Sequence, residues 1–451
     1  MIRNTMQYLL RWVEDAHRKP LVMRGARQVG KTWMVRELAR LSGKTLIELN
    51  IEHDLQYRSL LSSNDPKEVL LNLESVLGLS IVPANSLLFL DEIQAAPELL
   101  AKLRWFYEDM PELAVVAAGS LLEFALAEHE FSMPVGRIGY LYVEPLSFEE
   151  FLHAQNQSQL CDYLAAWDWG KVIPVSIHQK LMANIKEYMF IGGMPEAVFH
   201  WSKYRSLEKI DEIHLNLLST YRDDFSKYSK KILTTRLDEV LLSVPKMLGE
   251  KFVFSRVNKH IPAETLSKAL GLLCMARVCH RIPATYANGV PLGAEIKNGY
   301  TKVMLLDVGL VCSLLDIPLH QLKQLDDVSL VNQGGVSEQL VGQLLRHLTP
   351  DYKDAVLYYW LRDEKSSSAE LDYVIQHQGQ VVPIEVKSGS TGSLRSLHQF
   401  MHAKGLSRAV RFNADLPSMV EVKVKLSTGE PVYYTLWSLP FYLIGQLSRL
   451  L

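Results

Sequence analysis

One eight-residue stretch of the sequence has the residue types and spacing needed to bind phosphate groups. GARQVGKT, residues 25–32, fits the pattern GxxxxGK[ST], in which glycines let the backbone curl so that its N–H groups point at phosphate oxygens. Lysine at position 31 can reach the outer phosphates of a nucleotide, and the threonine hydroxyl at position 32 can bind Mg²⁺. The stretch predicts a site for ATP and Mg²⁺ formed by Gly25, Ala26, Arg27, Gln28, Val29, Gly30, Lys31, Thr32 and Trp33.

The residues on either side supply the elements that such a loop requires. An apolar strand is predicted at Leu21–Met23, and the helix after the loop has Met34, Val35 and Leu38 on one face. A chance glycine-rich turn is the alternative. The strand before the loop and the helix after it favour a phosphate-binding loop at a helix N-terminus.

A second strand ends in the acids that nucleotide hydrolysis requires. SLLFLDEIQ, residues 86–94, is an unbroken apolar run, typical of a parallel strand covered by helices on both faces. At its end, Asp91 is expected to hold Mg²⁺ through water, and Glu92 is placed to polarise the attacking water. A buried strand that merely ends in two acids is the alternative. A further strand at 113–120 ends in Ser120, which either senses the γ-phosphate or caps a helix.

A third group of charged residues interrupts apolar strands near the C-terminus. AELDYVIQHQGQVVPIEVKSG reads as two strands, with Asp372 in the first and Glu385 and Lys387 on one face of the second. Together with Glu338 from a preceding amphipathic helix, these acids could form an oxygen-rich Mg²⁺ site. Lys387 would then stabilise the charge that develops during phosphodiester cleavage. Two alternatives stay open: a hairpin with one polar face and cross-strand ion pairs, and a nuclease fold that has lost activity and only binds DNA.

Several motifs follow one another along the chain in an order that is found in one family. They are RGARQVGKT, FLDEIQ, AAGSLL, GR at 136–137, EPLSFEEFL at 144–152, GGMPEAV at 192–198, YRDDFSKY at 221–228, DVGL at 307–310 and the pair ELD … IEVK. With these motifs the sequence resembles a bacterial and archaeal group of AAA-superfamily ATPases with a C-terminal domain of unknown function. One departure is that only Ser120 precedes LLEF, where the family often has a run of serines.

The resemblance implies a homo-oligomer, commonly a ring. It also implies that Arg137 stabilises the charge of the transferring phosphoryl group, either in cis or in a neighbouring subunit. An ion pair between Arg137 and Glu144 or another acid is the alternative.

The order of predicted elements divides this α/β chain into four parts. These are a P-loop AAA-type ATPase core at 1–150, a helical lid at 151–233, a winged-helix-like domain at 234–315 and a restriction-endonuclease-like (PD-(D/E)xK) domain at 316–451. The winged-helix assignment rests on the order helix, helix, hairpin and on the resemblance. Six basic residues of the third part could contact DNA phosphates, although ordinary solvated helix faces are the alternative: Lys251, Arg256, Lys259, Lys268, Arg277 and Arg281.

Composition limits the classes of function. The 451 residues are 48% hydrophobic and 22% charged, as in soluble globular proteins. A net charge of −2 argues against coating nucleic acid by bulk charge, but it leaves a local basic patch open. The four cysteines show no CxxC pairing, which argues against a zinc ribbon. No apolar run approaches the ~18–20 residues that span a bilayer, so we expect a cytoplasmic protein outside the membrane.

Taken together, these patterns predict an ATP-hydrolysing protein that engages DNA, branched DNA included, and carries a metal-dependent nuclease-like site. The alternative is an ATP-driven molecular switch whose C-terminal half binds a protein partner without cleaving DNA. Salt dependence separates the two, because a DNA-binding protein loses affinity steeply as salt rises.

Overall fold

The computed structural model describes residues 2–120, 122–128, 134, 136–228, 233–317, 333–364, 367–388 and 393–451. The chain forms two compact units. Unit 1 comprises Met1–Glu144, Met275–Arg277 and Pro350–Asp354, and unit 2 comprises Pro145–Cys274, Val278–Thr349 and Ala355–Leu451. Unit 1 therefore includes two short segments from far along the chain. Across the described ranges, no helix combines the length and the apolar character needed to cross a membrane.

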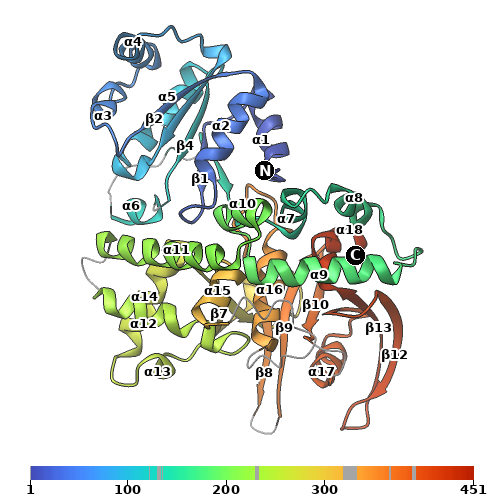
Figure 1. The fold of residues 1–451 in the computed structure, drawn as a ribbon. Helices are drawn as coiled ribbons and strands as arrows, with labels where there is room; N and C mark the ends of the chain where they lie inside the picture. The colour runs from blue at the N-terminus through green and yellow to red at the C-terminus, as the bar shows by residue number, and fades with distance from the viewer. Residues whose placement is uncertain are drawn as a thin grey trace. The chain divides into compact units, whose positions relative to one another are not determined.

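Unit 1 is built around a parallel sheet with the strand order β2-β3-β4-β1-β5 (Figure 1). Strands β3 and β4 are buried along their whole length, as expected for central strands covered by helices on both faces. The elements of unit 1 are α1 (Thr5–Glu14), β1 (Leu21–Arg24), α2 (Lys31–Ser42), β2 (Thr45–Asn50), α3 (Gln56–Leu60), α4 (Pro66–Leu77), β3 (Ser86–Asp91), α5 (Leu99–Asp109), β4 (Ala114–Ala118), α6 (Leu122–Glu128) and β5 (Gly139–Tyr142).

Unit 2 begins with a run of helices over the segment predicted as a helical lid. The first of them starts at a capping box formed by Ser147 and Glu150, and Pro195 opens the fourth. The helices up to the first strand of unit 2 are α7 (Phe148–Ala154), α8 (Ser158–Ala166), α9 (Val175–Ile191), α10 (Pro195–Tyr204), α11 (Leu207–Tyr228), α12 (Thr234–Ser243), α13 (Phe254–Val257) and α14 (Ala263–Met275).

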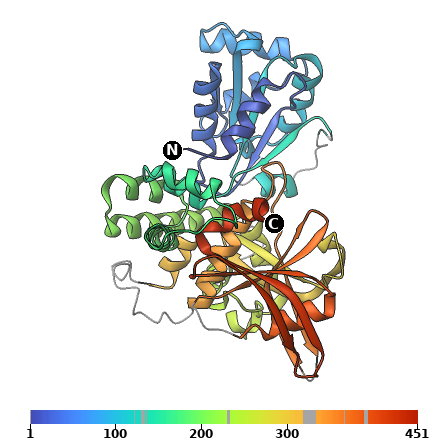
Figure 2. The same ribbon diagram turned by 90° about the vertical axis from the view of Figure 1, so that its right-hand side faces the viewer.

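The rest of unit 2 is a mixed sheet with the order β12-β13-β11-β10-β9-β8-β6-β7. Phe400 of α17 packs edge-to-face on Trp360 of β8, so this helix covers part of the sheet. Figure 2 shows β12 and β13, in red, as a long curved pair of strands. The remaining elements are β6 (Cys279–Thr285), β7 (Ile296–Leu305), α15 (Val308–Leu314), α16 (Gln333–Arg346), β8 (Tyr358–Glu364), β9 (Ser367–His377), β10 (Gln380–Val386), α17 (Arg395–Lys404), β11 (Arg408–Asn413), β12 (Ser418–Lys425), β13 (Pro431–Pro440) and α18 (Leu447–Leu450).

The hairpin predicted as the wing of a separate module belongs to this sheet. β6 pairs antiparallel with β7, and it also pairs in parallel with β8. The boundary predicted between residues 315 and 316 thus falls inside one compact unit, and residues 318–332 beside it lie outside the described residues. By contrast, the predicted order helix, three strands, helix is present as α16, β8, β9, β10 and α17.

Two motifs of the family resemblance meet inside unit 2. Asp307 of DVGL accepts a hydrogen bond from the backbone N–H of Gly193 (2.6 Å) and one from that of Gly309 (2.9 Å). Gly192 has φ of 73°, and a Cβ atom there would lie 2.0 Å from the Asp307 carboxylate. These motifs therefore have a structural role, because they fix the end of α9 to the start of α15.

Candidate functional site

The predicted phosphate-binding loop lies between β1 and α2 in unit 1. Gly30, just before α2, has φ of 95°, and Gln28 has φ of 65°, so the loop passes twice through the left-handed region. A Cβ atom at Gly25 would lie 2.5 Å from the carbonyl oxygen of Val143, which makes this approach possible only for glycine. The loop thus leads into a helix N-terminus, where backbone N–H groups bind anions.

Lys31 is held inside this loop. Its Nζ donates to the carbonyl oxygens of Gly25 (2.9 Å) and Ala26 (2.8 Å), and the residue is buried. Burial lowers the pKa of the Lys31 ammonium to about 8, and the Glu92 carboxylate opposes this shift. An ammonium bonded to the carbonyls of the loop can exchange these partners for phosphate oxygens.

The two residues predicted to share Mg²⁺ are in contact. Thr32 Oγ1 donates to Asp91 Oδ2 at 3.0 Å. Burial raises the pKa of Asp91, and the hydrogen bond from Thr32 opposes the shift. A hydroxyl and a carboxylate within one hydrogen bond of each other, beside a glycine-lined loop, are a donor set that fits ATP with Mg²⁺.

Glu92 follows directly, in a strained conformation. Its φ of 52° is unusual for a residue with a side chain, and its Oε2 accepts a hydrogen bond from Gln94 Nε2 at 2.6 Å. Gly119 gives Gln94 its space, because a Cβ atom at Gly119 would lie 2.3 Å from Gln94 Oε1. Ser120, the next residue, is buried beyond the end of β4. Gln94, which the sequence reasoning missed, thus orients Glu92 beside the strand end that carries Ser120.

Arg277 is a second residue of this unit whose role the sequence did not reveal. Its guanidinium donates to both carboxylate oxygens of Asp354 (2.7 and 3.1 Å) and to Glu144 (3.3 Å). The backbone oxygen of Glu144 also accepts from Arg3, which donates to the carbonyl of Val29 in the loop. The prediction that Arg277 contacts DNA phosphates is wrong, because its guanidinium is buried and paired.

Arg137, the arginine singled out by the resemblance, forms an ion pair with Glu108. Its Nε lies 2.9 Å from Glu108 Oε1, and Arg104 binds the same carboxylate. The pair is partly exposed, with 44% of the Arg137 side chain accessible. The acid that Arg137 contacts through this bond is therefore Glu108.

Four carboxylates converge in unit 2, and we call Glu338, Glu370, Asp372 and Glu385 the acid cluster. α16 supplies Glu338, β9 supplies Glu370 and Asp372, and β10 supplies Glu385. Burial, followed by the charge of Asp372, raises the pKa of Glu338 to about 8 and that of Glu385 to about 7. Asp372 Oδ2 accepts from the backbone N–H of Val386 at 2.6 Å. The acids predicted to act together are thus close in space.

A lysine from a distant strand lies among these acids. Lys302 on β7 places its Nζ 2.6 Å from Glu370 Oε1, 3.2 Å from Glu338 Oε2 and 4.0 Å from Asp372 Oδ1. Its side chain is 3% exposed. The cation that the structure places in the acid cluster is therefore an ammonium.

Lys387, the other lysine near the acid cluster, also forms an ion pair. Lys387 Nζ lies 2.6 Å from Glu385 Oε1, on the face that strand alternation predicts. In the described part of the chain, no three His, Cys, Asp or Glu side chains are arranged to hold a metal ion. A Mg²⁺ ion at Glu338, Asp372 and Glu385 would compete with the Lys302 ammonium, which lies 3.2 Å from Glu338 Oε2 and 4.0 Å from Asp372 Oδ1.

Sequence reasoning missed Glu370 and Lys302, although both left a signal. Glu370 precedes Asp372 by two residues, which places both side chains on one face of a strand. Lys302 begins the run KVMLL, and a lysine directly before an apolar run that is buried calls for a buried acid. Matching this lysine to the acids at 370 and 372 would have indicated that they lie close together.

A surface of unit 2 combines lysines with aromatic rings, and we call Lys251, Tyr286, Lys297 and Tyr300 the basic–aromatic patch. The ammonium groups of Lys251 and Lys297 lie 3.9 and 4.6 Å from the centre of the Tyr300 ring. Lys297 also lies 6.0 Å from the ring of Tyr286, which is half exposed. The backbone N–H of Phe252 donates a hydrogen bond to the carbonyl oxygen of Thr301. This bond holds the segment that contains Lys251 against β7 and so keeps Lys251 near Tyr300.

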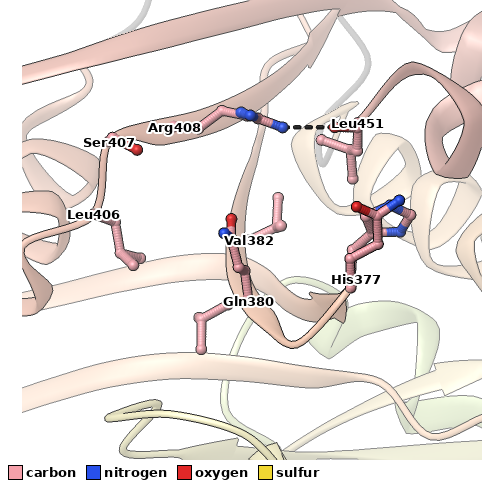
Figure 3. Close-up of a pocket in the computed structure, with 9 residues that line it drawn as sticks. His377, Gln380, Val382, Leu406, Ser407, Arg408 and Leu451 are labelled. Carbon is pink, nitrogen blue, oxygen red and sulfur yellow. Dashed lines mark hydrogen bonds between the residues drawn. The ribbon is translucent and has the colours of Figure 1, made fainter.

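A separate cavity of about 120 Å³ lies at the turn between β9 and β10 (Figure 3). Arg408 Nη1 donates to the carbonyl oxygen of Leu451 across it, at 2.6 Å. No member of the acid cluster lines this cavity. Its lining residues are His377, Gln378, Gln380, Val381, Val382, Leu406, Ser407, Arg408 and Leu451.

The parallel sheet, the glycine-lined loop after its first strand and the Thr32–Asp91 contact define a P-loop nucleotide-binding domain. Residues 17–152 match the family described as AAA domain, which supports an AAA-type ATPase domain in this part of the chain. Residues 182–321 match a domain of unknown function (DUF8612), and residues 333–425 match another (DUF4143). These matches support ATP binding and hydrolysis, and their descriptions assign no activity to unit 2.

Solved structures resemble the chain only distantly. The RuvB Holliday junction branch migration motor of Thermotoga maritima is 16% identical, with 62% of this chain and 89% of that chain covered and a TM-score of 0.31. PCH-2 of C. elegans is 11% identical over 45% of this chain and 62% of that one, with a TM-score of 0.26. Pif1 helicase from Candida albicans is 11% identical over 42% and 55%, with a TM-score of 0.23.

The aligned region covers less than two thirds of the PCH-2 chain and less than two thirds of the Pif1 chain. At these TM-scores the similarities carry no argument about function. No curated protein matches the chain in sequence.

Proposed function

We propose that unit 1 hydrolyses ATP with Mg²⁺ at the loop between β1 and α2. Lys31 would bind the outer phosphates, and Thr32 and Asp91 would hold Mg²⁺, which supplies charge neutralisation at the phosphates. Glu92, oriented by Gln94, would polarise the attacking water. The observation that carries the proposal is the contact between Thr32 and Asp91 at 3.0 Å, beside an ammonium already held by the loop.

Two variants separate binding from hydrolysis. Glu92→Gln should retain binding of a fluorescent ATP analogue while phosphate release slows by about 10²–10⁴-fold. Lys31→Ala should lose binding itself. Glu98→Gln is the matched control, because Glu98 is an acid of the same unit that pairs with Arg58 at the surface. Unchanged phosphate release in Glu92→Gln would remove the general base from this mechanism.

We further propose that unit 2 engages nucleic acid through the basic–aromatic patch. Its two lysines would contact phosphates, and its two tyrosines would stack on bases, a combination that binds single strands without reading sequence. The observation that carries this proposal is the position of both ammonium groups over the Tyr300 ring, with Tyr286 half exposed beside them.

Fluorescence anisotropy with labelled single-stranded, duplex and four-way-junction DNA tests the patch. The double change Lys251→Ala and Lys297→Ala should reduce the salt slope of log affinity by about 1.4 for single strands and about 1.8 for duplex DNA. Lys209→Ala, which removes a lysine paired with Glu212 on α11, should leave the slope unchanged. Wild-type protein that binds no DNA at any salt would favour the alternative, an ATP-driven switch that binds a protein partner.

A homo-oligomer belongs to the same proposal. In an assembly, Arg137 would leave Glu108 and reach the nucleotide of a neighbouring subunit, since their exposed ion pair costs little to break. Sedimentation with and without a non-hydrolysable ATP analogue would detect the assembly. Equal sedimentation of a monomer in both states, with full ATPase activity, would contradict it.

A further inference from the structure

Lys302 has the surroundings that a bound cation has in a carboxylate site. Oxygens of Glu370, Glu338 and Asp372 lie 2.6, 3.2 and 4.0 Å from its Nζ. On another side the ammonium faces the ring of Tyr359, whose centre is 5.1 Å away. A lysine has three N–H donors, so two short carboxylate contacts and one aromatic face satisfy it.

The side chain of Lys302 is fixed in this place. β7 pairs with β6 in register at Ile282, and the lysine is 3% exposed, so no solvent lies within easy reach of the ammonium. Burial alone would lower the pKa of Lys302, but the three carboxylates raise it above its ordinary value. The ammonium therefore keeps its charge.

Neighbouring segments also pack closely around Glu338 and Lys302. The segment that carries Gly249 passes so near that a Cβ atom there would lie 2.7 Å from Glu338 Oε1. Tyr359, whose ring faces the Lys302 ammonium, is fully buried. Mg²⁺ usually keeps several waters and needs about six oxygens at 2.0–2.1 Å. Because Lys302 Nζ lies 2.6 Å from Glu370 Oε1 and 3.2 Å from Glu338 Oε2, no room is left for a hydrated ion between the ammonium and these two acids.

We propose that Lys302 is the built-in cation of the acid cluster, standing where a carboxylate-bound divalent metal ion would otherwise sit. The cluster is then a latent metal site that the chain itself has filled. Unit 2 needs no divalent ion to hold these four acids together, and it does not cleave phosphodiesters by metal-assisted chemistry. This inference does not depend on ATP hydrolysis in unit 1 or on DNA binding by the patch.

The substitution Lys302→Met tests the proposal in the full-length, nucleotide-free protein. Methionine has a similar length and no charge, so the variant leaves three acids without their cation. Without metal its melting temperature should fall by at least about 5 °C. With about 1 mM Mn²⁺ it should recover most of that loss, because an ion that binds only the folded state stabilises it. Wild-type protein should shift by less than about 1 °C under the same conditions.

Two controls separate the cluster from other effects of the substitution. Lys302→Met combined with Asp372→Asn should lose the Mn²⁺ response, because one ligand of the opened site is gone. Lys297→Met removes a lysine from the same strand outside the cluster, and it should show no Mn²⁺ response. A folded Lys302→Met variant that ignores Mn²⁺ would overturn the proposal.

The wild-type protein provides a measurement that does not depend on folding of the variant. Titration with Mn²⁺, followed by electron paramagnetic resonance of the free ion, should detect no binding that Asp372→Asn abolishes. Binding in the wild type that Asp372→Asn removes would overturn the proposal, because it would mean that a metal enters the cluster despite Lys302. Absence of such binding supports it.

Discussion

Replacing Arg277 with methionine should destabilise unit 1 by about 3 kcal/mol. The change leaves Glu144, whose side chain is 11% exposed, as a buried carboxylate without its guanidinium. Removing one partner of a buried ion pair costs about 3–5 kcal/mol. Asp354 is half exposed and can regain water, so it adds little, and the lower end of that range applies. A loss of this size raises the opening constant about a hundredfold.

Amide hydrogen exchange over β1 and β5 in the full-length protein measures this effect, because both strands lie in unit 1 and Glu144 follows β5 closely. Arg36→Met is the matched control, since Arg36 pairs with Glu48 at the surface and is 60% exposed, and it should cost less than about 1 kcal/mol. Adding Glu144→Gln to Arg277→Met should restore part of the protection. Equal exchange in the Arg277 and Arg36 variants would refute the reasoning.

Three further perturbations test other parts of the structure. Gly192→Ala should destabilise unit 2 by more than about 2 kcal/mol in urea unfolding, because the new Cβ atom would lie 2.0 Å from Asp307, whereas Gly405→Ala, also at positive φ but with open space around it, should cost only about 1 kcal/mol. Burial lowers the pKa of His214 to about 4. Since the unfolded chain binds the proton more tightly between this value and about 6.5, unfolding free energy should fall by about 2 kcal/mol from about pH 7 to about pH 5, and the fall should be absent in His214→Gln. Gln94→Ala removes the 2.6 Å hydrogen bond to the proposed general base, so kcat should drop about tenfold with unchanged ATP affinity, and an unchanged kcat would show that Gln94 does not position the base.

The residues of the proposed nucleotide site could be selected from the sequence because its parts are local. Lys31 and Thr32 belong to one contiguous stretch with a specific spacing, and Asp91 ends an apolar run that is typical of a central strand. Gln94 was missed since a glutamine two residues after an acid has no distinctive pattern; its role depends on the space left by Gly119. Contacts between strand ends are set by the sheet order, which no local pattern encodes.

Charges that meet across long sequence distances were the hardest to assign. Arg277 lies 133 residues from Glu144 and 77 from Asp354, and its position just after a helix was equally consistent with a solvent-exposed phosphate contact. Lys302 was overlooked because its hairpin was assigned to a separate module, so its lysine had no acids to pair with. Both errors have one cause, because tertiary neighbours decide whether a charged side chain is buried. The local sequence shows that a buried charge needs a partner, but it does not show which residue the partner is.

The division of the chain between the two units bears on whether the stretch that matches the AAA family can be separated from the rest of the chain. Residues 275–277 and 350–354 return to unit 1, so the chain passes from one unit to the other five times, after Glu144, Cys274, Arg277, Thr349 and Asp354. The stretch that matches the AAA family ends at residue 152 and leaves both returning segments behind. A gene fusion that moved only this stretch would carry Glu144 without Arg277, which donates a hydrogen bond to it. We therefore expect residues 17–152 to be less stable when expressed alone than within the full chain.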